Sequence, residues 1–261
     1  MPTRRRPVPR RIKRYGWIPD LPDRRDRVYA APAETVAALP PRVDLRPACP
    51  PVYNQGMLGS CTANAIAGAL QFDQGRQQQP DVFTPSRLFI YYNERVIEGT
   101  VDEDSGAMLR DGIRSVAKIG APHEAIWPYV IARFRTKPAA AAYSDGTHHQ
   151  ALLYQRLVQT IDQLRGCLAA GFPFVFGFSV YESFESQTVT VTGRVPMPNP
   201  RESLLGGHAV LAVGYDHDRR EFLVRNSWGS RWGMSGYFTK PYDYLLDGGL
   251  SDDFWTIKLV E

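Results

Sequence analysis

Apolar residues recur at helical spacing in the first two thirds of the chain. Ala63, Ile66 and Leu70, for example, lie three or four residues apart. Such spacing predicts amphipathic helices, and it predicts four of them here, over about 60–74, 85–96, 107–118 and 161–170. Ser60 is expected as the N-cap of the first helix, and Pro85 falls in the first turn of the second. Glycines follow the third and fourth helices and should end them.

The last third of the chain has a different pattern. Short runs of β-branched and aromatic residues are separated by Gly, Asp and Pro, which predicts strands, at 174–180, 208–215, 222–225, 236–239 and 254–260. Residues 120–150 are expected to form a long loop, and residues 1–38 show no sustained period. Helices followed by strands indicate an α+β fold.

Charge is concentrated in the N-terminal arm, residues 1–38. Seven Lys and Arg residues and no acid lie within residues 1–14; the net charge of +4 less these seven leaves −3 for the remainder. The basic character therefore belongs to the arm, and the body is mildly acidic. No apolar stretch follows the cations, and no apolar run approaches the roughly 18 residues of a membrane span. We expect no Sec signal, no membrane contact and a cytoplasmic monomer.

The three cysteines are Cys49, Cys61 and Cys167, and no two form a C-x-x-C pair. This set predicts neither a disulfide framework nor a zinc site. Cys61 falls at the expected start of a helix, where the helix dipole favours a thiolate. Local sequence alone favours a structural alternative, in which Cys61 is a small buried apolar residue.

Two downstream residues change that balance. His208 follows a Gly-Gly pair at the start of an apolar strand, and Asn226 begins an Asn-Ser-Trp-Gly run 18 residues later. Each alone is more typical of a structural position. Together with Gln55 and Cys61 they give the order Gln, Cys, His, Asn, with His208 placed 147 residues after Cys61. A spacing of about 130–150 residues is the one found in papain-type enzymes.

On these motifs the chain resembles the papain-like cysteine peptidases, and it is most similar to their bacterial members. Further matches are Val43–Arg46, the Gly-Ser before Cys61, Val213–Tyr215 and the Gly-Tyr at 236–237. The resemblance covers residues 40–261 and implies a two-lobed fold, helical over about 45–155 and β-barrel-like over about 156–261, with the active-site cleft between the lobes. Thr62 stands where the family usually has Trp after the nucleophile, which leaves the reacting groups unchanged.

The resemblance implies a cysteine endopeptidase acting on a protein or peptide substrate. Cys61 would be the nucleophile, His208 its base and Asn226 the residue that orients the imidazole, while Gln55 would donate to the oxyanion. No cofactor or metal is needed. An acyl transferase or deamidase using the same triad is the alternative.

Substrate contacts are expected at a second group of residues, namely Gly59, Ser105, Gly106, Gly207, Trp228 and Asp253. For Ser105–Gly106, a loop that caps the following helix is an equally favoured interpretation. For Asp252–Asp253, the favoured interpretation is a solvent-facing acid pair; the alternative is that one carboxylate lines the base of the main specificity pocket. The arm is expected either to pack over the cleft as a short pro-segment or to form a disordered tail.

Other site classes fit less well. An acidic run from Asp102 resembles the start of a calcium loop, but its twelfth position is Ile113 rather than Glu, which excludes that motif. The His148–His149 pair is interpreted as a solvated loop pair, with metal binding as the less favoured alternative. A nucleic-acid binder would have to use the basic arm alone, because the body carries no recognised signature.

Overall fold

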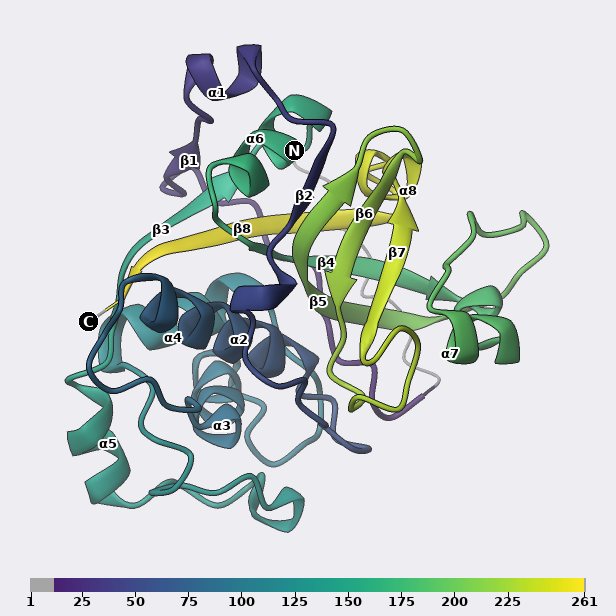
Figure 1. The fold of residues 1–261 in the computed structure, drawn as a ribbon. Helices are drawn as coiled ribbons and strands as arrows, with labels where there is room; N and C mark the ends of the chain where they lie inside the picture. The colour runs from purple at the N-terminus through teal and green to yellow at the C-terminus, as the bar shows by residue number, and fades with distance from the viewer. Residues whose placement is uncertain (1–11, 261) are drawn as a thin grey trace.

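The structure of the protein is a computed structural model, in which residues 12–260 are described. Eight helices and three short 3₁₀ turns form within these residues (Figure 1): α1 (Ala33–Ala37), α2 (Cys61–Arg76), α3 (Arg87–Glu98), α4 (Leu109–Ile119), α5 (Ala140–Gly146), α6 (Ile161–Ala169), α7 (Gln187–Thr192), α8 (Tyr242–Leu246), η1 (Arg46–Ala48), η2 (Ile131–Arg133) and η3 (Glu182–Glu185). None of them is long and apolar enough to cross a membrane.

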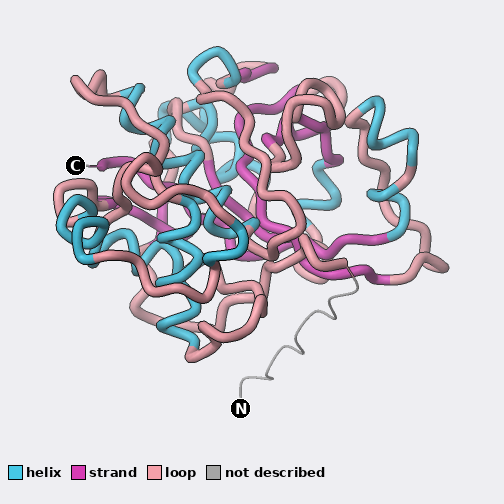
Figure 2. Tube along the Cα trace, turned by 90° about the horizontal axis from the view of Figure 1, so that it is seen from below, coloured by secondary structure: helices cyan, strands magenta, loops and turns pink. Residues whose placement is uncertain are grey.

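A single eight-stranded sheet forms the other half of the molecule. Its strands are β1 (Val28–Tyr29), β2 (Arg42–Asp44), β3 (Ala151–Leu157), β4 (Phe174–Tyr181), β5 (Leu204–Asp216), β6 (Glu221–Arg225), β7 (Tyr237–Pro241) and β8 (Ser251–Val260). They run in the order β1-β3-β8-β4-β5-β6-β7, and β2 pairs with β5. All of these pairs are antiparallel except β1 with β3. Figure 2 shows the helices gathered mainly on one side and the sheet running away from them. The predicted α+β fold, with a helical first part and a β second part, is confirmed.

Alternation along the central strands divides the apolar residues between two cores. Along β4, the rings of Phe174, Phe176 and Phe178 lie in one core, while Val175 lies in the other with α2, α3 and α4. Because neighbouring side chains of a strand point to opposite faces, one strand serves both cores. Helix α2 is buried along most of its length, including the polar residues Thr62, Asn64 and Asp73.

The predicted helices and strands are found, with shifted ends. The second helix begins at Arg87, not Pro85, because the Ser86 hydroxyl caps it by accepting from the N–H of Phe89. Ser60 does occupy the N-cap position of α2, but its hydroxyl bonds Tyr129 instead of capping the helix.

The N-terminal region and the 120–150 segment contain elements that periodicity did not predict. These are β1, α1, η2 and α5. Each is seven residues or shorter and is held by tertiary contacts, so it shows no repeat long enough to detect. Five of the seven basic residues within residues 1–14 lie outside the described residues.

Candidate active site

Cys61 is the first residue of α2, at the end of the helix that carries the partial positive charge. It forms no disulfide and is fully buried. The loop that precedes the helix has the sequence Gln-Gly-Met-Leu-Gly-Ser and turns tightly, so that the side chain of Gln55 donates a hydrogen bond to the carbonyl of Leu58. This local geometry places a thiol at the N-terminus of α2.

His208 lies on β5 and is hydrogen bonded to Asn226, which follows β6. The imidazole Nε2 and Asn226 Oδ1 are 2.9 Å apart. Asn226 Oδ1 also accepts from the N–H of Ser227, so the amide oxygen faces the ring and Nε2 must carry the hydrogen. The other nitrogen, Nδ1, therefore holds a lone pair, and it has no hydrogen-bond partner among the described residues. His208 thus has an unprotonated Nδ1 that could accept a proton.

Gln55 is the third polar group of the site and its side chain is fixed from two sides. Its Oε1 accepts from the Ser227 hydroxyl at 2.5 Å, and its Nε2 donates to the carbonyl of Leu58 at 2.8 Å. The remaining N–H of the same amide donates to the carbonyl of Arg14 at 2.9 Å. The amide is therefore directed at a main-chain carbonyl oxygen supplied by a distant part of the chain.

That carbonyl belongs to residues 12–18, which we call the covering segment. Its backbone joins the two halves of the molecule. Trp17 donates to the carbonyl of Gly207, while on the helical side Ile18 donates to the carbonyl of Ala107, whose own N–H donates to the carbonyl of Gly16. Gly16 allows this close approach: a Cβ there would meet the carbonyl oxygen of Gly59 at 1.9 Å.

Trp17 is the anchor of the covering segment. Its ring occupies the space above Gly177, where an added Cβ would lie only 1.9 Å from the indole. The indole N–H donates to Asp253 Oδ2 at 3.0 Å, and the same oxygen accepts from the N–H of Asp20. The favoured interpretation of Asp253 as a solvent-facing acid is wrong, because its side chain is 1% exposed. Its neighbour Asp252 is partly exposed and pairs with Arg156.

The first residues of the covering segment lie over the imidazole. The ring of Tyr15 meets that of His208 edge-on, with centroids 5.7 Å apart. The guanidinium of Arg14 lies 3.7 Å above the ring of Trp228, which itself stacks on His208 at 4.9 Å. Glu185 holds both arm residues, pairing with Arg14 at 2.6 Å and accepting from the Tyr15 hydroxyl.

Burial and charge together keep His208 neutral in this arrangement. Its pKa is lowered to about 3, mainly because the ring is desolvated. The bond to Asn226 opposes the shift, whereas the cations of Arg14 and Lys240 add to it. The covering segment supplies part of the burial and one of the two charges.

The remaining predicted substrate-binding residues are also placed by the structure. Gly106 donates to the Tyr91 hydroxyl, and the hydroxyl of Ser105 bonds to Thr100. The covering segment pairs with neither of them but with Ala107, one position further along. Sequence reasoning did not single out Ala107, whose backbone alone takes part and leaves no side-chain signal.

The pair His148–His149 separates in the structure. His148 is exposed, whereas His149 is partly buried and packs edge-on against Phe83 at 4.5 Å. The interpretation of both as solvated loop residues is therefore wrong for His149.

Comparison with known proteins gives a family for this geometry. Residues 39–243 match the family described as papain family cysteine protease. The chain belongs to the papain family of cysteine proteases. A curated relative, an uncharacterized peptidase C1-like protein of Acanthamoeba polyphaga mimivirus, is 43% identical, over 95% of this chain and 88% of its own length.

Solved structures support the same assignment. Xylellain, a cysteine protease from Xylella fastidiosa, superposes on this protease with a TM-score of 0.91 at 48% identity, covering 97% of this chain and 99% of xylellain. That coverage extends well ahead of residue 39, where the family match begins. The digestive procathepsin L 3 of Tenebrio molitor larval midgut shares the fold, with a TM-score of 0.72 at 19% identity over 95% of this chain and 77% of its own.

Proposed function

We propose that this protease is an endopeptidase that works through Cys61, His208, Asn226 and Gln55. One observation carries the proposal: the Gln55 amide donates to a main-chain carbonyl, that of Arg14, beside the helix that starts at Cys61. A group that already binds a peptide carbonyl is placed to bind the carbonyl of a scissile bond.

The reaction follows from the roles of these groups. His208 Nδ1 takes the thiol proton, and the thiolate attacks the carbonyl carbon of the substrate. Negative charge then develops on the carbonyl oxygen, where Gln55 Nε2 and the backbone N–H of Cys61 donate to it. The imidazolium returns its proton to the leaving amine, and a thioester remains on Cys61. Water, deprotonated by His208, hydrolyses the thioester and regenerates the thiol.

The same thioester also serves the alternative function. An acyl transferase would pass the acyl group to an amine instead of water, and a deamidase would release ammonia from a side-chain amide. Mass spectrometry of the products from one peptide, with and without an added amine, distinguishes the three. A cleaved peptide with a free carboxylate as the main product supports the endopeptidase.

We further propose that the covering segment restrains the enzyme. It lies where a substrate carbonyl would bind Gln55, and its burial of His208 disfavours the imidazolium that a reactive ion pair requires. Release of the segment would restore solvent to the ring and remove the nearby charge of Arg14. Both changes raise the pKa of His208 toward its ordinary value.

Asp253 is proposed as the specificity determinant of the site that Trp17 fills. The carboxylate accepts an N–H from that side chain, so a substrate side chain bearing a donor is expected to replace it. Cleavage of peptides with Arg and with Phe at the second residue before the scissile bond tests this. Equal rates for the two would remove Asp253 from specificity.

The central experiment labels the thiol with an epoxide-type inactivator. Wild type and Cys61→Ala are compared, each as the full chain and after removal of residues 1–18. Labelling of wild type only, and faster after removal, supports both proposals. Labelling of Cys61→Ala to the same extent would refute the nucleophile, whereas labelling of Cys61 at an unchanged rate after removal would refute the restraint alone.

A further inference from the structure

A second cluster of chemically active side chains lies in the helical part of the molecule. His123 pairs with Pro85 in an isolated β-bridge, Asp145 belongs to α5, and His149 lies two residues before β3. One ligand atom from each lies within 4.8 Å of the others. None of the three belongs to the catalytic group.

His123 faces a carboxylate at each ring nitrogen. Nδ1 is 2.9 Å from Asp145 Oδ2, and Nε2 is 2.9 Å from Asp81 Oδ2. A neutral imidazole has one N–H, so only one of these contacts can be a hydrogen bond. The other brings a lone pair against an anionic oxygen. Either a second proton or a metal cation removes that conflict.

The third member of the cluster favours a cation. If His123 carried a second proton, the two carboxylates would satisfy both of its N–H groups and no further base would be needed. The ring of His149 nevertheless lies only 5.0 Å from that of His123. A ligand atom of His149 lies within 4.8 Å of those of His123 and Asp145, so this ring faces the same space. Two imidazoles and a carboxylate are a donor set that suits Zn²⁺.

We propose that His123, Asp145 and His149 form a binding site for one Zn²⁺ ion. Asp81 would accept the Nε2–H of His123, which leaves Nδ1 for the metal; a carboxylate commonly holds a zinc-bound histidine in this way. Two ligands on a tetrahedral Zn²⁺ are about 3.4 Å apart when each bond is about 2.1 Å. The three ligand atoms lie within 4.8 Å of one another, so no pair needs to close by more than about 1.4 Å. His123 Nδ1 and Asp145 Oδ2, at 2.9 Å, need to move apart by about 0.5 Å. Both shifts are within reach of side-chain rotation.

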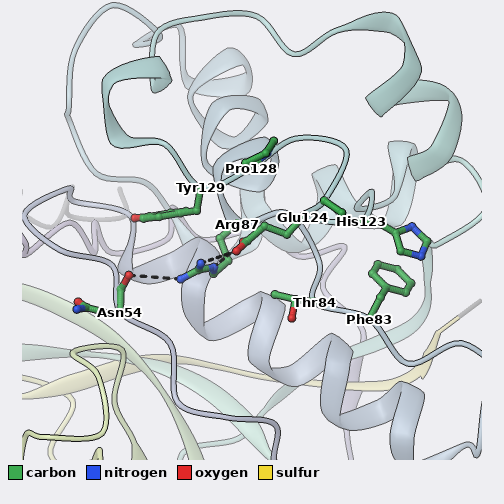
Figure 3. Close-up of a pocket in the computed structure, with 9 residues that line it drawn as sticks. Asn54, Phe83, Thr84, Arg87, His123, Glu124, Pro128 and Tyr129 are labelled. Carbon is green, nitrogen blue, oxygen red and sulfur yellow. Dashed lines mark hydrogen bonds and ion pairs between the residues drawn. The ribbon is translucent and has the colours of Figure 1, made fainter.

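The surroundings suit such a site. Phe83 stacks on His123 with ring centroids 3.7 Å apart, which fixes the plane of the imidazole, and Figure 3 shows the two rings side by side. Both residues line a cavity of about 670 Å³ that also reaches Arg87 and Glu124, and this cavity gives an ion a path to the histidine.

The proposed ion would join three segments that backbone hydrogen bonds and the Arg87–Glu124 ion pair already connect. Ser86 donates to the carbonyl of Pro122, and Ala121 donates to the carbonyl of His149. An ion on the three ligands would tie the start of α3, the end of α5 and the start of β3 to one another. Its expected role is to stabilise the helical half, because ligand binding to the folded state alone raises its stability.

The test is a titration of the full-length Cys61→Ala variant with Zn²⁺, followed by calorimetry. Removing the thiol prevents binding at the catalytic site from being mistaken for the new one. We expect one ion per chain and a rise in melting temperature. Asp145→Asn and His149→Gln should abolish both effects, and Asp81→Asn should weaken binding by about tenfold, the low end of the usual 10–100-fold range because Asp81 is exposed.

His148→Gln is the matched control, since it changes an exposed histidine one position away. It should bind Zn²⁺ as the parent does. Near-UV circular dichroism checks that every variant is folded before titration. No binding to Cys61→Ala, or binding that persists in folded Asp145→Asn and His149→Gln, overturns the site, as does equal loss of binding in the control.

Discussion

Replacing Trp17 by Ala tests whether the covering segment limits access to Cys61. The indole is almost fully buried and makes a hydrogen bond to Asp253. Truncating a buried Trp to Ala typically costs about 3–5 kcal/mol. If the segment detaches while the rest of the protein stays folded, the substitution lowers the free energy that favours the covered over the uncovered form by this amount. At 1.4 kcal/mol per tenfold, the uncovered fraction rises by about two to three and a half powers of ten.

The assay is the rate at which an epoxide-type inactivator labels Cys61. The thiol is fully buried in the covered form, so labelling reports the uncovered fraction when detachment is fast. The rate should rise by the same factor until most molecules are uncovered, and then level off. Leu21→Ala is the matched control, because Leu21 lies just beyond the segment and is 58% exposed.

One result would refute the reasoning. If Trp17→Ala labels Cys61 no faster than wild type and Leu21→Ala, then detachment of residues 12–18 does not control access to the thiol. A melting temperature measured on each variant separates this outcome from general unfolding, which would raise labelling and lower stability together.

Three further predictions follow from the same site. In the Trp17→Ala background, Gln55→Ala should keep the fold but lower kcat/KM by about 10²–10³, the usual effect of losing an oxyanion donor; an unchanged value in a peptide hydrolysis assay would remove Gln55 from the site. The covered state lowers the pKa of His208 from 6.5 to about 3, so the uncovered state binds the proton more tightly. Lowering the pH from about 6.5 towards 3 should therefore raise the ratio of uncovered to covered molecules by up to about tenfold per pH unit. Hydrogen exchange of the Trp17 and Ile18 amides, corrected for the intrinsic exchange rate, should become faster as the pH falls. The same pH dependence in His208→Gln would contradict the role of His208. Lys240→Met should leave the free energy of unfolding unchanged or raise it. The buried amino group of Lys240 has no hydrogen-bond partner among the described residues, and burial lowers its pKa well below the ordinary value. A loss of more than about 2 kcal/mol in denaturant unfolding would show that cation–π contacts with Phe178 and Tyr244 dominate.

The positions of the proposed reacting groups could be predicted from the sequence because short motifs mark them. Glycines beside His208 and the Ser-Trp-Gly after Asn226 are local signals that survive without knowledge of the fold. The long helices were equally accessible, since α2 and α4 repeat their apolar residues over several turns.

Other features depend on contacts between residues far apart in the chain. The Nζ of Lys240 lies 3.7 Å from the centre of the Phe178 ring. From the sequence alone, a lysine in a strand would be expected to be exposed to solvent. Asp253 is a buried acceptor for the indole of Trp17, 236 residues away, and for the N–H of Asp20. The periodicity of apolar residues does not indicate contacts between distant residues. The position of the covering segment could therefore not be predicted from its sequence.

The N-terminal region consists of two parts with different ties to the body, which bears on how restraint would be released. Asp20 is buried and accepts from Trp255 Nε1 at 2.9 Å and from the N–H of Arg110 at 3.0 Å. Tyr29 is buried as well, within β1, which pairs with β3. Removing all of residues 1–38 would therefore expose core groups and leave Arg110 and Trp255 without an acceptor, at about 1–3 kcal/mol for each unsatisfied group. Removing residues 1–18 takes away the contacts over His208 and leaves this network intact, so the release that we propose requires only that the chain detach ahead of Asp20.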